Sequence, residues 1–565
     1  NYQYPSYVGW ISQALPSSMA YRTAYFFNVI QLLLVIAFVN NDLRAFKFSG
    51  MESIRVRPFS NEEIVLGNFG GKLLLFTLVN FLTLGISILI NATFYPHAFD
   101  FGIYLFYWLT LNLPTLVFFL GVSFFVIRVV RQQALSFVIL SVFFWGLIFW
   151  GAGWLNGLFD PCARHIPNMF SDFTGHVGMG NYLLQRSFIF FTGISCLLLS
   201  IIPYPRIPNR VFGYRSVLGR VCVIFVFAAC LGLWYMSLYN SVGNNREKYK
   251  RIYSEYEKFT GVKVVQNDLQ VKALEENGIS VTSRMIVENR APVPLPLVMY
   301  LNPGLKILSL EIDGNRVDFQ RKQQAIVADK KLEAGEMAEV LLRYEGGIEK
   351  DICFLDVIPE KYYSETINNY GIYYFGNVPA FCERDYKLFI PECMWYPVCV
   401  PLYGVSGLRD VNFSRYSLQV EHEPRLKAIS QGSTVQEKEG VTIFAFEHNM
   451  PGISLCVGNY ERREITVDST RMALYYFPRH DYLLEEYEHF SEECLLDELA
   501  YAKSNTFELS GCIRTRKFSG RKRNYDPTQQ YPYRWLTLVE VPCGFYSFPS
   551  LMQLSGERVQ GGMVF

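Results

Sequence analysis

Residues that could carry out metal chemistry are few in this 565-residue chain, and their spacing is wrong for it. A zinc peptidase site needs two histidines at i and i+4 of one helix, a glutamate between them as base, and a later glutamate ligand. The chain has seven histidines but no H-E-x-x-H: His480 has no partner at that spacing, His489 stands alone, and Pro424 interrupts the pair that begins at His422. His422 and His448 lie in strand-rich sequence, where a structural role is expected. We therefore predict no catalytic residue and no metal ligand set in this sequence.

Nucleotide and redox chemistry have no sequence support either. No G-x-x-x-x-G-K-[ST] motif occurs, so any ATPase that works with this protein must be a separate chain. Eight of the twelve cysteines follow position 240, where disulfides can form in an oxidising compartment, but none has C-x-x-C spacing. The net charge is +1 and no basic patch with interleaved aromatic residues occurs, so we expect no nucleic-acid partner.

The hydropathy of the chain changes near Asn240. Six long apolar runs precede this point, and each approaches or exceeds the roughly 20 residues that cross a bilayer as a helix. The runs are 24–40, 73–94, 103–127, 134–155, 187–202 and 221–238. We predict an α-helical membrane bundle over residues 23–240, with the lipid bilayer as a partner.

The distribution of basic residues predicts the orientation of these runs. Lysine and arginine gather in the loop 41–72, in the turn after the third run, and in the connection 203–220, whereas 91–102 has neither. The positive-inside rule places the basic loops in the cytoplasm. Six crossings then leave the segment 1–22 and everything after Ser241 outside, in a multi-pass protein of the cell membrane.

The apolar runs contain almost no ionisable side chain, which argues against a charge relay across the membrane. Asn28 and Gln31 are the main polar residues of the first run, and we expect them to hydrogen-bond to other helices. Pro114 is expected to be a tolerated membrane proline that can kink the third run.

The loop 41–72 has an amphipathic first part, then Arg57-Pro58, and then a capping start for the next helix from Ser60 to Glu63. It resembles the loop of type-2 ABC exporter permeases, in which a segment framed by "R-P-x-S-x-x-E" and "G-K" carries the coupling helix. The resemblance implies that the segment from Leu43 to Arg57 docks on a cytoplasmic ABC ATPase subunit. The residues implied for this coupling are Leu43, Arg44, Glu52, Arg55 and Arg57.

The same resemblance implies how the membrane helices are completed. In type-2 permeases the long cytoplasmic loop follows the second span, whereas here it follows the first apolar run. We therefore expect the family's first span upstream of Asn1. The sixth run is then an added crossing that leads outside. A second permease half or a homodimer partner is also implied.

The second half is predicted to begin with a helical stalk, residues 241–262, followed by a β-domain over 263–470. Short β-rich runs separated by turn residues predict an antiparallel sandwich or saddle. These runs are 281–288, 297–301, 307–312, 325–327 and 338–344, with a second series over 373–466. After Pro478 the apolar spacing becomes helical over 482–495, within a final segment 471–565.

The order of six segments in this half is informative. They are "SRMIVENRAPVPLPLVMYLNPGLKILSLEIDGNRVDF", "AEVLLRYEGGI", "WYPV", "FSRYSLQVEHEPRLKAISQG", "FAFEHNMPGISLCVGNYE" and "YYFPRHDY". Together they resemble the amino-terminal β-domain of alanyl-aminopeptidase-type zinc peptidases, the gluzincins, over residues 264–480. The text from "YPYRWLTLVEVP" onward is similar to the opening of that family's catalytic domain. The whole chain thus resembles bacterial fusions of a type-2 ABC permease with such a peptidase domain.

The family's exopeptidase loop, G-A-M-E-N, corresponds to positions 561–565. This chain keeps Gly561, Gly562 and Met563 but has Val564 where the family's glutamate holds the free amino group of a peptide. Glu557 is either a substitute anchor for that amine or an ordinary surface carboxylate. We expect the sequence to stop before a metal site, so that zinc enters only if a longer chain continues into one.

Three functions follow from these observations. The first is an exporter permease that carries a peptidase-like domain outside. The second is a membrane-anchored zinc aminopeptidase whose metal site lies beyond residue 565. The third is a non-catalytic domain that binds peptides or an envelope partner. The transported substrate cannot be deduced from the apolar helix faces.

Overall fold

The computed structural model describes residues 16–48, 60–94, 99–171, 174–203, 212–274, 277–358, 362, 369–401, 411–467, 470–478, 480, 534–547, 559–560 and 563–564. The chain divides into two compact units. The first comprises Asn1–Ser241 with Glu365–Gly376, and the second comprises Val242–Ser364 with Asn377–Phe565.

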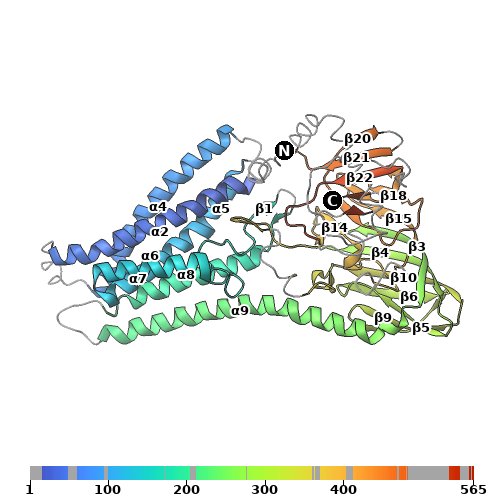
Figure 1. The fold of residues 1–565 in the computed structure, drawn as a ribbon, viewed down its shortest axis with the longest axis horizontal. Helices are drawn as coiled ribbons and strands as arrows, with labels where there is room; N and C mark the ends of the chain where they lie inside the picture. Colours follow the sequence, from blue (N-terminus) through green and yellow to red (C-terminus); the bar gives the residue numbers. More distant parts are fainter. Residues whose placement is uncertain are drawn as a thin grey trace, which may run out of the picture. The chain divides into compact units, whose positions relative to one another are not determined.

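The first unit is helical, and its helices lie side by side (Figure 1). Two of them contain π-helical turns, η2 and η3. The elements are α2 (Pro16–Phe48), α4 (Asn61–Phe94), α5 (Phe101–Tyr107), η2 (Trp108–Asn112), α6 (Leu113–Val130), α7 (Gln133–Gly146), η3 (Leu147–Gly151), α8 (Met179–Leu199) and α9 (Phe212–Tyr256). Six helical stretches among the described residues are long and apolar enough to cross a membrane. The six predicted runs are therefore confirmed as long apolar helices, most of them longer than predicted.

Local sequence signals explain where these helices begin and bend. The predicted capping box at the start of α4 is present: the Glu63 N–H donates to Ser60 Oγ at 3.2 Å, and the Ser60 N–H donates to Glu63 Oε2 at 2.7 Å. Pro114 lies in the first turn of α6, directly after η2. Proline has no N–H to donate to the preceding turn. The π-turn η2 accommodates this missing hydrogen bond, so the helix continues without a break.

The helices differ in how much of their surface the unit itself covers. In the most apolar part of the continuous stretch α5–η2–α6, 72% of the residues are buried, whereas the share is 17% in α4 and 22% in the stretch that includes α9. Large apolar side chains such as Leu82, Val142 and Leu233 are more than two-thirds exposed. The unit therefore has a central helix, α6, and peripheral helices whose apolar faces no described residue of the chain covers.

The packing of α6 on α8 depends on two glycines. A Cβ atom added to Gly193 of α8 would lie 2.6 Å from the Phe118 Cα atom, and one added to Gly121 of α6 would lie 2.0 Å from the Gly193 carbonyl oxygen. Small residues of this kind let two helix backbones approach closely in an apolar unit. Any side chain at these positions must push the two helices apart.

We therefore expect Gly193→Val to lower the midpoint of thermal unfolding of the full chain in detergent by several degrees. The midpoint is measured as the loss of the monodisperse size-exclusion peak after heating. Gly85→Val in α4 is the control, because nothing lies within 4 Å of a Cβ added there. Equal midpoints for the two variants would contradict this account of the α6–α8 contact.

The second unit is mainly β-structure, and its largest sheet has eight strands in the order β17-β18-β15-β3-β4-β10-β6-β7. Figure 1 labels β18, β15, β3, β4, β10 and β6 of this sheet. The strands of this sheet are β3 (Val262–Ala273), β4 (Ile279–Asn289), β6 (Leu305–Ile312), β7 (Asn315–Arg316), β10 (Met337–Gly346), β15 (Arg415–Glu421), β17 (Ser433–Lys438) and β18 (Val441–Ala445). Side chains of β4 and β10 alternate between buried and less buried positions, which places one face of the sheet on a core.

Three smaller sheets complete the second unit. A three-stranded sheet consists of β5 (Leu295–Tyr300), β9 (Ala325–Leu332) and β8 (Phe319–Lys322). A four-stranded sheet consists of β13 (Phe381–Cys382), β14 (Lys387–Phe389), β19 (Leu455–Gly458) and β16 (Lys427–Ser430). A five-stranded sheet consists of β20 (Glu461–Val467), β21 (Thr470–Tyr476), β22 (Trp535–Val539), β24 (Met563–Val564) and β23 (Val559–Gln560).

The five β-rich runs predicted between 281 and 344 are confirmed as β4, β5, β6, β9 and β10. Most neighbouring strands of the predicted β-domain are antiparallel, as predicted, but β3 pairs with β15 in parallel, which the prediction did not include. In the final segment, β21, β22 and β24 are also parallel. The strands of each parallel pair are far apart in sequence, so no short hairpin forces them to be antiparallel. The predicted helix over 482–495 lies outside the described residues.

The last turns of α9 belong to the second unit, where one buried arginine binds them to the chain that follows β10. Arg246 is 3% exposed. Its guanidinium donates to the Cys353 and Phe354 carbonyl oxygens, both at 2.7 Å, and to the Asp351 carbonyl oxygen at 3.2 Å. The segment predicted as a stalk thus ends as a helix that is hydrogen-bonded to its own unit.

Candidate functional site

The two helices that flank the predicted coupling loop are joined by a polar cluster. Lys72 of α4 donates to both carboxylate oxygens of Asp42 of α2, at 2.9 and 3.0 Å, and Asn68 donates to the same carboxylate at 2.8 Å. The Lys72 and Asp42 side chains are only 13% and 22% exposed, so this ion pair is better shielded from water than a surface pair. The cluster therefore joins α2 to α4, the two helices that flank residues 49–59.

The structure describes only some of the residues that were predicted to contact an ATPase. Leu43 and Arg44 belong to the last turns of α2, next to Asp42. Glu52, Arg55 and Arg57 lie outside the described residues. Glu62, in the first turn of α4, forms an ion pair with Arg220 of α9.

A second polar cluster lies in the connection between η3 and α8. The Asp160 carboxylate is 1% exposed and accepts hydrogen bonds from the Cys162 N–H at 2.9 Å, the His165 N–H at 2.8 Å and the His165 ring at 3.2 Å. Burial alone would raise the pKa of Asp160, but the hydrogen bond and charge of His165 and the charge of Arg186 together hold this pKa below its ordinary value. The carboxylate is therefore ionised at neutral pH.

Two side chains of α8 complete this second cluster. Arg186 donates to the Pro161 carbonyl oxygen at 2.8 Å and to the Gln185 side-chain oxygen at 2.6 Å. The Gln185 amide donates to the Gly157, Leu158 and Asp160 carbonyl oxygens at 2.9–3.0 Å. Because these groups satisfy one another's hydrogen-bond donors and acceptors, the cluster can hold the connection between η3 and α8 in one conformation.

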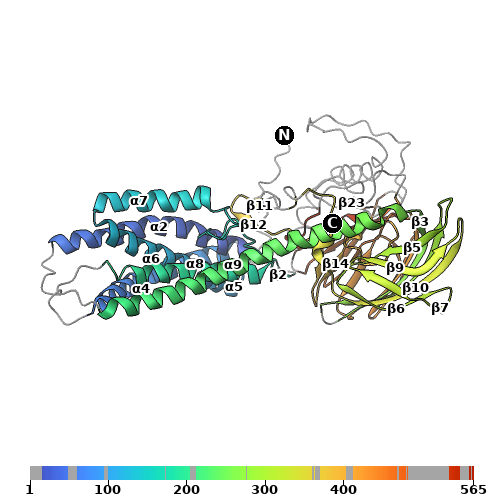
Figure 2. The same cartoon turned by 90° about the horizontal axis from the view of Figure 1, so that it is seen from below.

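A short hairpin from the second half of the sequence belongs to the first unit and binds the same connection. It consists of β11 (Asn369–Tyr370) and β12 (Tyr373–Tyr374), labelled in Figure 2. Asn168 donates to the Ile372 carbonyl oxygen at 3.1 Å, and its own side-chain oxygen accepts from the Tyr374 N–H at 3.0 Å. The Asn168 N–H also donates to the Tyr374 carbonyl oxygen at 2.9 Å. Asn168 therefore binds this hairpin through both its side chain and its backbone N–H.

The predicted peptide-binding motif falls on the short strand β24. Met563 is fully buried and pairs with Thr537 of β22 in parallel. Gly561, Gly562 and Glu557 lie outside the described residues, so their predicted role in binding an amine stays a prediction. Glu540 follows β22; its carboxylate accepts the Phe477 N–H at 2.7 Å and contacts the His480 ring nitrogen at 2.5 Å. These contacts suit a structural role for Glu540.

The described residues do not fit a zinc ion. No group of three or more histidine, cysteine, aspartate or glutamate residues among them is placed to hold a metal. His480 Nδ1 lies 2.5 Å from the Glu540 carboxylate, and the two ring nitrogens of His422 contact the Glu423 carbonyl oxygen at 2.9 Å and the Thr442 hydroxyl at 3.0 Å. A tetrahedral zinc site needs at least three converging protein ligands, which these arrangements lack.

Comparisons with known proteins give similarity to solved structures only. No family model and no curated protein matches the chain. The crystal structure of an M1 zinc metallopeptidase from Deinococcus radiodurans matches at 16% identity and a TM-score of 0.33, over 54% of this chain and 60% of that one. A mutant of that enzyme bound to a Tyr-Ser-Ala substrate matches at 15% identity and a TM-score of 0.32, over 49% and 56%. The chain thus spans less than two-thirds of the length of these structures.

Sequence reasoning missed most of the polar clusters. Asp160 and Arg186 are charged residues next to apolar runs of the sequence. Charged residues in such positions are typical of polar clusters inside a helical unit. Asn168 carried no signal, because its partners are backbone atoms of a hairpin about 200 positions later.

We expect Asp160→Asn to lower the free energy of unfolding at pH 7 by about 1–3 kcal/mol, because the amide cannot accept all the hydrogen bonds that the carboxylate accepts. A lowered native pKa gives stability that is present above the unfolded pKa, about 3.9, and is lost as the pH falls through the native value. The difference between variant and unsubstituted chain should therefore shrink below about pH 4. Thermal unfolding of the full chain in detergent from pH 3 to pH 8 measures it.

The control for this prediction is Asp329→Asn, which changes an exposed aspartate of β9. Its unfolding midpoint should follow that of the unsubstituted chain at every pH. A constant offset of Asp160→Asn from pH 8 down to pH 3 would show that the carboxylate charge is not what stabilises this connection.

Proposed function

We propose that this protein is the permease subunit of an ABC-type exporter that carries an aminopeptidase-like domain on the extracytoplasmic side of the cell membrane. The observation that carries the proposal is the joined pair of helices α2 and α4, whose cytoplasmic ends flank a loop with the motif of a coupling segment. An ATPase subunit and a second permease half complete the transporter.

Placement in a bilayer is supported by the surfaces of the helical unit. The peripheral helices expose leucine, valine and phenylalanine side chains over lengths sufficient to cross a bilayer. In water such surfaces would be unfavourable by about 25 cal/mol per Å², whereas lipid accommodates them. Trp150, Trp154 and Phe94 are 81%, 69% and 70% exposed and lie at helix ends, where aromatic side chains favour the interface between lipid and water.

Coupling to an ATPase is supported by the geometry beside the loop. A coupling segment must transmit force from a bound ATPase to the membrane helices, which requires a stiff connection at both of its ends. The capping box at Ser60 and the cluster of Asp42, Asn68 and Lys72 supply such a connection. Arg55 and Arg57 would then present positive charge to the ATPase.

The extracytoplasmic role rests on the ordered sequence segments that resemble the amino-terminal domain of alanyl aminopeptidases. This domain would bind a peptide or a protein of the cell envelope. Catalysis by zinc would require ligands other than the described residues. The alternative of a membrane-anchored zinc aminopeptidase therefore depends on sequence after Phe565, and the presence of H-E-x-x-H there would favour it.

We expect a membrane-impermeant maleimide to label Val435→Cys on intact cells and Gln132→Cys only after permeabilisation. Val435 is 66% exposed on β17, and Gln132 lies exposed between α6 and α7. Labelling above that of the unsubstituted chain is measured by mass spectrometry of the purified protein. Labelling of Gln132→Cys but not of Val435→Cys on intact cells would reverse the proposed orientation.

Charge reversal in the coupling loop should remove the ATPase. We expect the full chain with Arg55→Glu and Arg57→Glu, purified from native membranes, to recover at least tenfold less co-eluting ATPase subunit by quantitative mass spectrometry. The matched control is Arg206→Glu with Arg210→Glu, which makes the same charge change in another basic loop. Unchanged ATPase recovery in the first variant would count against the permease assignment.

A further inference from the structure

A buried histidine lies among aromatic side chains just before α8. His176 is the last residue of a hairpin that consists of β1 (Phe170–Ser171), labelled in Figure 1, and β2 (Gly175–His176), labelled in Figure 2. The hairpin belongs to the connection between η3 and α8, and it lies outside the six apolar helical stretches. His176 is only 8% exposed, so its ring is almost completely shielded from water.

Three aromatic rings from different elements pack against the imidazole of His176. Its centroid lies 4.8 Å from the ring centroid of Tyr182 of α8 and 5.1 Å from that of Phe170 of β1. The ring of Phe106 of α5 lies 6.0 Å away, and it also contacts the rings of Phe170 and Tyr182. The four rings therefore form one cluster, which holds the hairpin against α5 and α8.

The two ring nitrogens of His176 have no hydrogen-bond partner among the described residues, although both atoms are buried. A neutral imidazole has one N–H donor and one acceptor, so both of these groups stay unmet. Each unmet group lowers the stability of the folded state, whereas phenylalanine would join the same cluster without such a group. Stability at neutral pH therefore does not explain why position 176 is a histidine.

Protonation of this ring would add a second unmet donor and a buried positive charge. Burial lowers the pKa of His176 to about 4, and the nearby backbone of Val177 and of His176 itself opposes this shift only in part. The faces of aromatic rings attract a cation, but this attraction is smaller than the loss of hydration. The closed hairpin therefore requires a neutral ring at position 176.

The groups that pack around the ring provide no counter-charge for an imidazolium. Among the described residues, no aspartate or glutamate contributes to the pKa of His176. Tyr182 is an uncharged phenol, and its hydroxyl lies 3.2 Å from the Thr110 hydroxyl. The Arg186 guanidinium lies 6.0 Å from the centre of the Tyr182 ring, so the nearest described charge is positive and disfavours a second positive charge.

The other titratable groups of the connection have separate contacts. Asp160 binds the backbone N–H and the ring of His165, and Arg164 donates to the Gly371 carbonyl oxygen at 3.1 Å. Asp172 lies between the two strands of the hairpin in the sequence and is outside the described residues. Its carboxylate is the one rival group that only a substitution can test.

The hairpin is joined to the first turn of α2. The Ser17 hydroxyl donates to the Phe170 carbonyl oxygen and accepts from the Phe170 N–H, both at 3.0 Å. Ser17 is fully buried, so these bonds have no competition from water. The same helix ends within the predicted coupling loop, residues 41–72. A change in the hairpin therefore acts directly on the start of the helix that leads to this loop.

We propose that His176 is a proton-sensitive lock: its neutral ring keeps the hairpin of β1 and β2 closed on α5 and α8, and protonation opens the hairpin and releases Ser17 of α2. This inference rests on the proposed function in one respect, the orientation that places the connection outside the cell. In an exporter, acidity outside would then act on the helix that leads to the coupling loop.

The opening of the hairpin is measured by amide hydrogen exchange of the full chain in detergent, followed by mass spectrometry at pH 7.5 and pH 5.0. In the open hairpin the ring regains its ordinary pKa of about 6.5. With a pKa of about 4 in the closed state, the opening constant should be about 30-fold larger at pH 5.0 than at pH 7.5. Exchange in peptides from 168–178 is divided by the intrinsic rate at each pH, and peptides from β4 are the reference. Equal opening constants at both pH values would overturn the proposal.

Substitutions identify the group that responds to protons. His176→Phe and His176→Leu remove the titrating ring, so the opening constant of the hairpin should no longer depend on pH. The matched control is His422→Phe, which should keep the full pH dependence, because His422 lies in the second unit and both of its ring nitrogens have partners. Asp172→Asn and His165→Asn should also keep it. Loss of the pH dependence in either of these variants, with retention in His176→Phe, would assign the response to another residue and overturn the proposal.

A second measurement needs no substitution. The exchange of the histidine C2 hydrogen, followed by mass spectrometry across a pH series, reports the protonation of each imidazole. In the folded chain the midpoint for His176 should lie at least about one pH unit below its midpoint in the chain unfolded in urea. Equal midpoints would show that the folded protein does not oppose protonation of this ring, and the proposal would be wrong.

The measurements in detergent depend neither on membrane orientation nor on an ATPase, so they test the lock even where the permease assignment fails. Right-side-out membrane vesicles then test the orientation. With the internal pH kept at 7.5, lowering the external pH to 5.0 should open the hairpin, as measured by the same amide exchange. Opening that requires internal acid instead would support the lock and contradict the proposed orientation.

Discussion

Polar groups inside an apolar helical unit must be satisfied by one another, and this constraint governs the first half of the molecule. With no water nearby, every buried carboxylate, guanidinium or amide needs a partner within the unit. Asp160, Arg186 and Gln185 meet this requirement with backbone carbonyl and N–H groups of the connection before α8. The cost of burying these charges is thereby offset, and the connection acquires one preferred conformation.

The same constraint explains how the helices and their neighbouring segments are joined. Asp42, Asn68 and Lys72 join α2 to α4 at the limits of the predicted coupling loop, residues 41–72, and Asn168 binds the hairpin of β11 and β12. Between these polar joints, contacts such as that of Gly121 with Gly193 are made by backbone atoms alone. Polar joints and close backbone contacts together hold the helices of this unit in one arrangement.

Sequence patterns were sufficient to predict the six long helices, because apolar runs of this length are typical of helices that cross a membrane. They also predicted the capping box at Ser60, because its residues are only three positions apart. They also placed Asn28 and Gln31 in contact with other helices. They did not predict the parallel pairing of β3 with β15, whose partners are about 150 residues apart. They also did not predict that Asn168 binds the hairpin of β11 and β12. Each failure concerns a contact between distant segments that neither composition nor periodicity encodes. The predicted substrate residues Gly561, Gly562 and Glu557 remain predictions.

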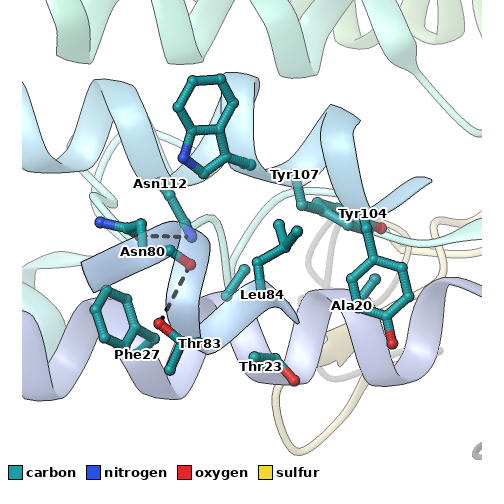
Figure 3. A pocket seen from close by; sticks show the side chains of 11 residues that line it. Ala20, Thr23, Phe27, Asn80, Thr83, Leu84, Tyr104, Tyr107 and Asn112 are labelled. Carbon is teal, nitrogen blue, oxygen red and sulfur yellow. Dashed lines mark hydrogen bonds between the residues drawn. The ribbon is translucent and has the colours of Figure 1, made fainter. Parts of the chain in front are cut away.

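The Asp160 cluster and a second buried polar group of the helical unit differ in how fully their hydrogen bonds are satisfied. The Asp160 cluster is charged, and the side-chain groups described there all have partners, which suits a structural joint. The second group is a neutral chain of amides in which Asn28 donates to Asn112, Asn112 to Asn80 (Figure 3), and Asn80 to Gln31. Among the described residues, its ends have one unmet acceptor, Asn28 Oδ1, and one unmet donor, Gln31 Nε2. Leucine at these positions would pack without an unpaired group, so stability alone does not explain why amides occupy them.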